Sequence, residues 1–91
     1  MFEFDPVKSA LNKDKHGIGF VEAQALWLDE GRIEQLARSD VELRNLTVGQ
    51  IDGLLWCAVF TLRQGIIRII SVRRARKNEA EAYDRFQNNR A

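Results

Sequence analysis

Basic side chains gather in one stretch of this chain, where they could bind phosphate groups. The net charge is only +1, yet residues 46–91 carry +4 and residues 1–45 carry −3. Between positions 63 and 77 there are six basic residues and no acidic one, namely Arg63, Arg68, Arg73, Arg74, Arg76 and Lys77. Such a block attracts phosphate, although a solvated strand edge and helix start would have the same composition.

Two adjacent arginines, Arg73 and Arg74, lie near the end of this stretch and precede a predicted helix. Exposed N–H groups at a helix start would complete an anion site with them. Glu79 lies one turn inside that helix and could pair with either arginine. Such a pair could hold a guanidinium in place for chemistry, or it could only join the helix to the sheet. The sequence leaves both interpretations open.

Three other side chains could act in chemistry or binding. His16, within Lys15-His16-Gly17, could be an acid or base near neutral pH, or a cation that interacts with the dipole of the helix it ends. Tyr83 could stack on a nucleic-acid base or pack against the core. Cys57 lies in the most apolar segment and is interpreted as a core residue, not a nucleophile.

Metal and cofactor chemistry has little support in the sequence. The chain holds one histidine and one cysteine, and neither an HExxH nor a CxxC motif, so we predict no metal site and no cofactor. A single cysteine allows no internal disulfide and favours a reducing, cytoplasmic location. The longest apolar run, residues 54–60, is too short to span a membrane. The N-terminus also lacks the order of a secretory signal.

Hydrophobic periodicity and turn residues predict one α+β domain over residues 1–91. Strands are expected at residues 2–5, 32–37, 43–51, 54–62 and 66–74. The turns between them are expected at Ser39-Asp40, Asp52-Gly53 and Gln64-Gly65. Strict alternation along residues 66–74 would place Arg68 and Arg74 on one face of the sheet, and Ser71 and Arg73 on the other.

Three helices are expected around these strands. The first, over residues 6–15, begins with Asp5 and Pro6, ends at Gly17, and has an apolar stripe of Val7, Ala10 and Leu11. The second begins after Gly19, with Glu22 as a capping-box residue, and ends at residues 29–31. The third covers residues 75–88. This order predicts a small antiparallel meander with two N-terminal helices and one C-terminal helix.

The order of several motifs resembles the BrnT family of toxins. The first half of the chain contains Phe2-Glu3-Phe4-Asp5-Pro6, Lys8, Lys15-His16-Gly17, Phe20 and Glu22-Ala23. The second half contains Arg44, Gly49, Thr61-x-Arg63, the run from Ile67 to Ala75, Glu79 and Tyr83. The resemblance covers almost the whole chain and is weakest over residues 29–43. Gly19 stands where the family often has serine, and glycine still caps a helix acceptably.

This resemblance implies a type II toxin with a RelE-like fold that cleaves RNA and stops translation. The implied partner is a BrnA-type antitoxin with a ribbon-helix-helix part. Two toxins and two antitoxins would assemble together and reach operator DNA only through the antitoxin. An inactive, toxin-like binding subunit or a nucleic-acid-binding module without cleavage would have the same sequence.

Metal-free RNA cleavage needs a proton-transfer group and cations that stabilise the phosphate. We therefore expect five catalytic residues, namely His16, Arg63, Arg73, Arg74 and Glu79. The arginines would stabilise phosphate charge, and His16 or Glu79 would transfer protons. Four residues are expected to contact RNA, namely Lys15, Arg44, Arg68 and Tyr83.

Overall fold

A computed structural model describes residues 1–38 and 43–90 as an α+β fold with one five-stranded sheet. The strands are β1 (Phe2–Glu3), β2 (Ile33–Arg38), β3 (Leu43–Ile51), β4 (Leu54–Arg63) and β5 (Ile66–Arg74). The helices are α1 (Pro6–His16), α2 (Phe20–Ala23), the 3-10 helix η1 (Gln24–Leu28) and α3 (Lys77–Asn89). None of the described helices combines the length and apolar character that crossing a membrane requires.

The sheet is mixed, which corrects the predicted antiparallel meander. Its strand order is β1-β5-β4-β3-β2, and β2 to β5 do form an antiparallel meander. The N-terminal strand β1 pairs in parallel with β5, however, because α1 and the following elements separate β1 from its neighbour in the sheet. β1 is also shorter than predicted. The predicted turn at Ser39-Asp40 lies outside the described residues.

Local signals placed the two long hairpins and the first helix correctly. Both residues of the Asp52-Gly53 and Gln64-Gly65 turns have positive φ angles, as the tightest hairpin turns require. Asp5 accepts a hydrogen bond from the backbone N–H of Val7 at 2.8 Å and so caps α1. Gly17 ends this helix with a φ angle of 83°.

The predicted apolar stripe of α1 is wrong. Val7 and Leu11 are 67% and 61% exposed, and Ala10 is exposed too. The buried side chain of this helix is Asn12. Three apolar residues at helical spacing therefore face solvent, because a polar side chain on another face of the helix bonds to the sheet edge.

The second predicted helix is divided into a single α-turn and a 3-10 turn. Ala23 and Leu26 are both fully buried. Ala23 ends α2 and Leu26 lies in η1. Because side chains three residues apart lie in line on a 3-10 helix, the tighter turn that follows Ala23 aims Leu26 into the same core. Glu22 accepts a hydrogen bond from the N–H of Gly19 at 3.1 Å, which confirms its predicted capping role.

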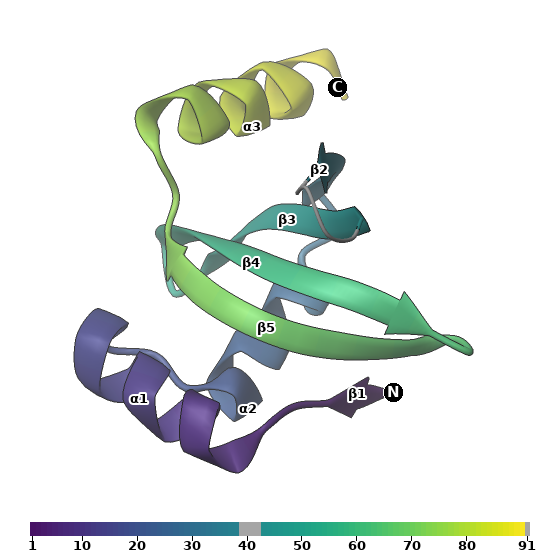
Figure 1. Ribbon diagram of the computed structural model, residues 1–91. Coiled ribbons are helices and arrows are strands. Elements are labelled where there is room, and N and C mark those ends of the chain that lie inside the picture. The colour runs from purple at the N-terminus through teal and green to yellow at the C-terminus, as the bar shows by residue number, and fades with distance from the viewer. Residues whose placement is uncertain (39–42, 91) are drawn as a thin grey trace.

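Helices cover both faces of the sheet (Figure 1). The N-terminal helices cover one face with a core of Ile18, Phe20, Ala23, Leu26, Trp56, Ala58, Ile69 and Val72. On the other face α3 packs mainly against β3 through a second cluster, in which Tyr83 contacts Val48 and Cys57. The face that carries α3 is called the α3 face below.

A β-bulge interrupts the pairing of β4 with β5. Val59 lies opposite Ser71, whereas the next residue of β4, Phe60, lies opposite Ile69. Ile70 is therefore an extra residue in β5. A bulge of this kind reverses the alternation of side chains beyond it. Ile69 and Val72 accordingly lie in the same core cluster although they are three residues apart.

Candidate functional site

Arg73 and Glu79 form a two-point ion pair between β5 and α3. Arg73 Nη1 and Nη2 donate to Glu79 Oε1 and Oε2 at 2.7 and 2.9 Å. The backbone N–H of Arg76, which precedes α3, donates to Glu79 Oε1 at 2.8 Å. The helix therefore begins two residues later than predicted, at the position where Glu79 caps it. Arg73, not Arg74, is the partner of Glu79.

Glu79 is held as a carboxylate by these contacts. The hydrogen bonds from Arg73, and secondarily that from the Arg76 backbone, lower its pKa from 4.5 to about 2. Glu79 itself raises the pKa of Arg73. A buried carboxylate with so low a pKa is a weak base at neutral pH. The geometry favours Glu79 as the group that orients Arg73 over Glu79 as a proton acceptor.

The neighbouring thiol is not activated. Cys57 lies opposite Arg73 in the sheet and is fully buried. Its burial raises the pKa of the thiol to about 11, although the charge of Arg73 acts in the opposite direction. Cys57 is therefore a neutral thiol at neutral pH, in agreement with its interpretation as a core residue.

Arg74 points to the opposite side of the sheet from Arg73. It pairs across the strands with Trp56, which belongs to the core under the N-terminal helices. Its guanidinium carbon lies 5.4 Å from the centre of the Trp56 ring, and its Nε donates to the carbonyl of Leu55 at 3.2 Å. Arg74 is exposed and packs on an aromatic ring. The two adjacent arginines therefore do not meet one phosphate together.

The bulge brings Arg68 and Arg73 to the same face, which corrects the alternation predicted from the sequence. Arg68 lies opposite Thr61, and Ile67 on its N-terminal side packs in the core under the N-terminal helices, so Arg68 is on the α3 face. Beyond the bulge Arg73 is on that face too, opposite Cys57. Ser71 lies between these two arginines on the same face.

Two more arginines extend this surface. Arg44 is two residues before Leu46, which belongs to the cluster under α3, so alternation places Arg44 on the α3 face. Arg63 is two residues beyond Thr61 and lies at the end of the β4–β5 hairpin. We call Arg44, Arg63, Arg68 and Arg73 the arginine face.

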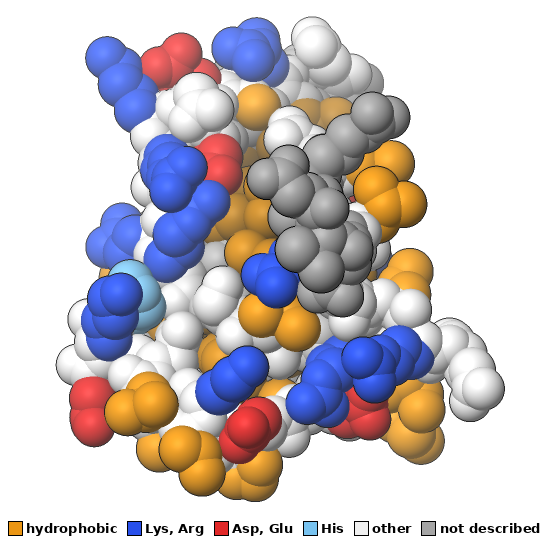
Figure 2. All heavy atoms as spheres, viewed as in Figure 1, with side chains coloured by type: hydrophobic (Ala, Val, Ile, Leu, Met, Phe, Trp, Pro, Cys, Tyr) orange, Lys and Arg blue, Asp and Glu red, His pale blue; other side chains and the backbone are white. Residues whose placement is uncertain are grey.

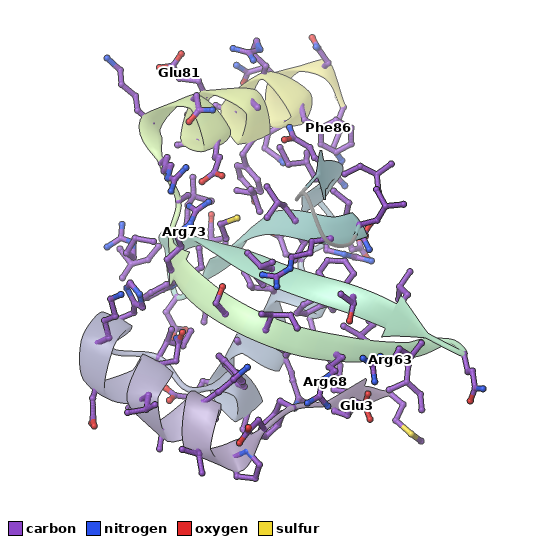
Figure 3. All side chains as sticks on the ribbon, in the orientation of Figure 1. Glu3, Arg63, Arg68, Arg73, Glu81 and Phe86 are labelled. Atoms are coloured by element: carbon purple, nitrogen blue, oxygen red, sulfur yellow. The ribbon has the colours of Figure 1, made fainter. Side chains whose placement is uncertain are left out.

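The arginine face is long rather than compact. Figure 3 shows Arg73 at one end of the β4–β5 hairpin, and Arg63 and Arg68 with Glu3 toward the other. Arg68 and Arg73 are five residues apart in β5, which corresponds to about 16 Å along a strand. Arg68 Nη1 lies 3.6 Å from Glu3 Oε1. This separation is too long for one phosphate to meet both arginines, so they would contact separate phosphates of a nucleic-acid strand.

Lys15 and His16 lie apart from this face, in the last turn of α1. Lys15 is exposed and His16 is half-buried. Figure 2 shows lysine and arginine side chains along the edge of the molecule that carries the pale blue histidine, and a second basic group toward the β4–β5 hairpin end. The α1 helix packs against β5, so its last turn is tied to the strand that carries Arg68 and Arg73.

Tyr83 is buried, which argues against its predicted contact with RNA. Only 7% of its surface is exposed, and its hydroxyl donates to Asp29 Oδ2 at 2.7 Å. Burial and the Asp29 carboxylate raise its pKa to about 12. The backbone N–H groups of Gly31 and Gln50 also donate to Asp29, each at 2.8 Å. Tyr83 therefore joins α3 to the loop before β2 and presents no ring face to a base.

Sequence reasoning missed Asn12 and Asp29. Each satisfies several buried or half-buried backbone groups, and neither belongs to a motif of charged residues. The residue type of Asn12 could have indicated its role, because asparagine disfavours the interior of a helix unless its side-chain amide makes hydrogen bonds. Asp29 was predicted only as one of the residues at which the second helix ends.

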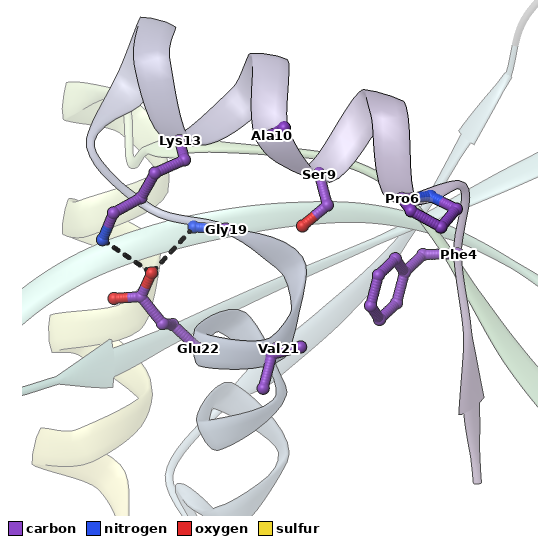
Figure 4. Close-up of a pocket in the computed structure, with 8 residues that line it drawn as sticks. All are labelled: Phe4, Pro6, Ser9, Ala10, Lys13, Gly19, Val21 and Glu22. Atoms are coloured by element: carbon purple, nitrogen blue, oxygen red, sulfur yellow. Dashed lines mark hydrogen bonds and ion pairs between the residues drawn. The ribbon is translucent and has the colours of Figure 1, made fainter.

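A shallow hollow of about 370 Å³ lies between α1 and α2 (Figure 4). Phe4, Pro6, Ala10 and Val21 provide most of its apolar lining. At its rim Lys13 Nζ lies 2.7 Å from Glu22 Oε1, and this contact lowers the pKa of Glu22. The ion pair is exposed and neutral overall, so the hollow offers little to an anionic ligand. It lies on the side of the molecule opposite the arginine face.

Within residues 1–38 and 43–90, the side chains of His, Cys, Asp and Glu do not form a group of three or more that could hold a metal ion. The chemistry that the described residues offer is that of arginine guanidiniums, a histidine and backbone N–H groups. Such groups bind and stabilise phosphate charge.

A comparison with known families finds a match over most of the chain. A family model described as the ribonuclease toxin BrnT of type II toxin–antitoxin systems matches residues 4–79. The match includes α1, the whole sheet from β2 to β5, and Glu79. No individual curated protein matches the chain.

Proposed function

The chain belongs to the BrnT family of ribonuclease toxins of type II toxin–antitoxin systems, and we propose that it is a metal-independent endoribonuclease that stops translation. The observation that carries this proposal is the arginine face, in which the Arg73 guanidinium is held by both oxygens of Glu79. A cation fixed in this way requires little reorganisation when charge develops on a phosphate. The α+β sheet with helices packed on it suits the RelE-like architecture implied by the sequence.

The proposed reaction uses the RNA's own 2′-hydroxyl as nucleophile. The 2′ oxygen forms a bond to phosphorus while the bond from phosphorus to the 5′ oxygen breaks. A base takes the 2′ proton and an acid gives a proton to the leaving 5′ oxygen. The products are a 2′,3′-cyclic phosphate and a 5′-hydroxyl. Arg73 would stabilise the negative charge on the phosphorane oxygens.

His16 is the candidate for proton transfer, because Glu79 is engaged by Arg73 and Arg76. Arg44, Arg63 and Arg68 would guide the RNA backbone along the sheet. Lys15 and Arg74 would add positive charge near the end of β5 without touching the scissile phosphate. Glu79 would be a positioning residue.

The proposed partner is a BrnA-type antitoxin in an assembly of two toxins and two antitoxins. Neutralisation requires that the arginine face be covered, and an acidic or amphipathic segment of the antitoxin would do so. Operator DNA would be bound through the antitoxin's ribbon-helix-helix part. The toxin would act on RNA in the cytoplasm.

The purified chain incubated with a labelled RNA in EDTA tests this function. We expect cleavage with cyclic-phosphate ends, slowed about 10²–10³-fold in Arg73→Ala and unchanged in Arg85→Ala. Arg85 is a matched control because it is an exposed arginine on α3, outside the arginine face. Activity that disappears in EDTA and returns with a divalent ion would contradict metal independence. RNA binding without any cleavage would indicate a binding subunit instead.

A further inference from the structure

Asn12 makes three hydrogen bonds that join α1, the turn after it and β5. Its Nδ2 donates to the carbonyls of Ile18 at 2.8 Å and of Val72 at 2.9 Å. Its Oδ1 accepts from the N–H of Val72 at 3.2 Å. The side chain is buried, with 8% of the residue exposed, and Val72 is fully buried. Both the backbone N–H and the backbone carbonyl of Val72 are thus hydrogen-bonded to the Asn12 side chain.

This contact takes the place of a neighbouring strand. In the described part of the chain, β1 pairs with β5 only at Ile67 and Arg68. Further along, at Val72, the outer edge of β5 is met by the Asn12 amide, which donates and accepts as a strand backbone would. Buried backbone groups at this edge would otherwise lack partners.

The position of the contact matters because it lies directly beyond the bulge. Ile70 is the extra residue, and Val72 follows two positions later, next to Arg73. A slip of β5 by one residue beyond the bulge would move every side chain there to the other face. The Asn12 contact holds the register in which Arg73 shares a face with Arg68.

We propose that Asn12 is a positioning residue for RNA cleavage, which holds the bulged edge of β5 so that Arg73 lies on the arginine face. This inference rests on the ribonuclease function proposed above. The same contact ties α1, whose last turn carries His16, to the strand that carries Arg73. Asn12 would therefore set the geometry between the fixed cation and the proton-transfer group without touching RNA itself.

The test compares Asn12→Ala and Asn12→Asp with Ser9→Ala. Ser9 is a matched control because its hydroxyl, also on α1, accepts the N–H of Phe20 at 2.9 Å and so bonds to α2 rather than to β5. Cleavage is measured well below the melting temperature of each variant. Asn12→Asp keeps the acceptor and the shape, but it replaces both donors by an oxygen that faces the carbonyls of Ile18 and Val72. It is therefore the more disruptive variant, and Asn12→Ala serves if Asn12→Asp does not fold.

We expect both Asn12 variants to lower kcat by about 10–100-fold with KM changed less than about threefold, because small misplacements of reacting groups have effects of this size. Ser9→Ala should lower the melting temperature and leave kcat unchanged. If Asn12→Ala, or a folded Asn12→Asp, retains the kcat of the wild type, Asn12 is only structural and the inference is overturned.

A second measurement separates this inference from the proposed function. NMR signals of the arginine side chains are followed while an uncleavable 2′-O-methyl RNA is added. In the wild type Arg68 and Arg73 should respond at the same RNA concentration, and in the Asn12 variants the response of Arg73 alone should be lost. This result would support the inference even if the wild type cleaved no RNA, which would refute the proposed function. An unchanged response of Arg73 in the variants, or none in the wild type, would overturn the inference.

Discussion

At the scale of single residues, the Arg73–Glu79 ion pair bears on both the stability of the fold and the proposed RNA cleavage. The same guanidinium that would stabilise a phosphate also joins β5 to α3. The two roles are compatible because a guanidinium has five N–H groups. Nη1 and Nη2 each donate one of theirs to Glu79, and Nη1 also donates to the carbonyl of Arg74 at 3.3 Å. By this count the N–H of Nε and one N–H of Nη2 would be left for a phosphate.

The stability of the wild type should depend on pH through Glu79. Its folded pKa of about 2 lies below the ordinary value of 4.5. The stabilisation is therefore fully present above about pH 4.5 and is lost as the pH falls toward 2. Glu79→Gln should lower the free energy of unfolding at pH 7 by roughly 2–3 kcal/mol, because it leaves Arg73 without its counter-charge. Urea unfolding at several pH values would measure this. A difference between variant and wild type that does not shrink below pH 4 would contradict the assignment.

Arg73→Ala and Arg74→Ala should have unequal effects. Loss of Arg73 removes both the ion pair with Glu79 and the proposed phosphate contact, so we expect a lower melting temperature and about 10²–10³-fold slower cleavage. Loss of Arg74 removes an exposed contact with Trp56, worth about 0.5–1 kcal/mol, and should slow cleavage less than about tenfold. Single-turnover kinetics and thermal unfolding would measure the two effects. Equal losses of cleavage would place the reacting phosphate at the strand end, between the two faces.

At the scale of helices and strands, the sequence predicted the parts whose signals are local. The turns at Asp52-Gly53 and Gln64-Gly65, the Asp5 cap and the Gly17 helix end each depend on one or two residues with special backbone preferences, and these four features are present. The pairing of β1 with β5 and the bulge at Ile70 depend on contacts between distant segments. Periodicity could not show them, and the bulge reversed the predicted face of Arg68 relative to Arg73.

The prediction of the candidate site residues was limited in the same way, because it could not include contacts between distant segments. Composition identified the arginines and Glu79, but it could not decide between Arg73 and Arg74 as the partner of Glu79. That choice follows from which face each side chain takes beyond the bulge. The sequence could not place the ring of Tyr83, because an aromatic residue on an amphipathic helix has the same pattern whether its ring packs or binds.

The attachment of α3 depends on Tyr83 as well as on Glu79. Tyr83→Phe keeps the packed ring and removes the hydrogen bond to Asp29, which retains two backbone donors. We expect the free energy of unfolding to fall by about 1–2 kcal/mol, with RNA affinity and cleavage unchanged. Thermal unfolding and a binding titration with uncleavable RNA would measure both. If Tyr83→Phe weakened RNA binding and left the stability unchanged, Tyr83 would be a residue that contacts RNA.

At the scale of the whole molecule, the charge is nearly balanced but unevenly placed. A net charge of +1 gives little general attraction for RNA. RNA binding should therefore depend on the arginine face rather than on overall charge. Removal of a cation from that face should weaken RNA binding, and removal of a cation elsewhere should not. The exposed cations of α3, such as Arg85, provide the comparison.

The dependence of RNA affinity on salt would count the phosphate contacts. For single strands the slope of log K against log salt concentration is about −0.7 for each neutralised phosphate. Four arginines on the arginine face would give a slope of about −3. Replacement of Arg44, Arg63 or Arg68 by alanine should each reduce the slope by about 0.7, whereas Arg85→Ala should leave it unchanged although the net charge falls equally. Fluorescence titrations with a 2′-O-methyl oligonucleotide at several salt concentrations would measure these slopes. An equal reduction in all four variants would mean that RNA senses the overall charge, and the arginine face would then not be the binding surface.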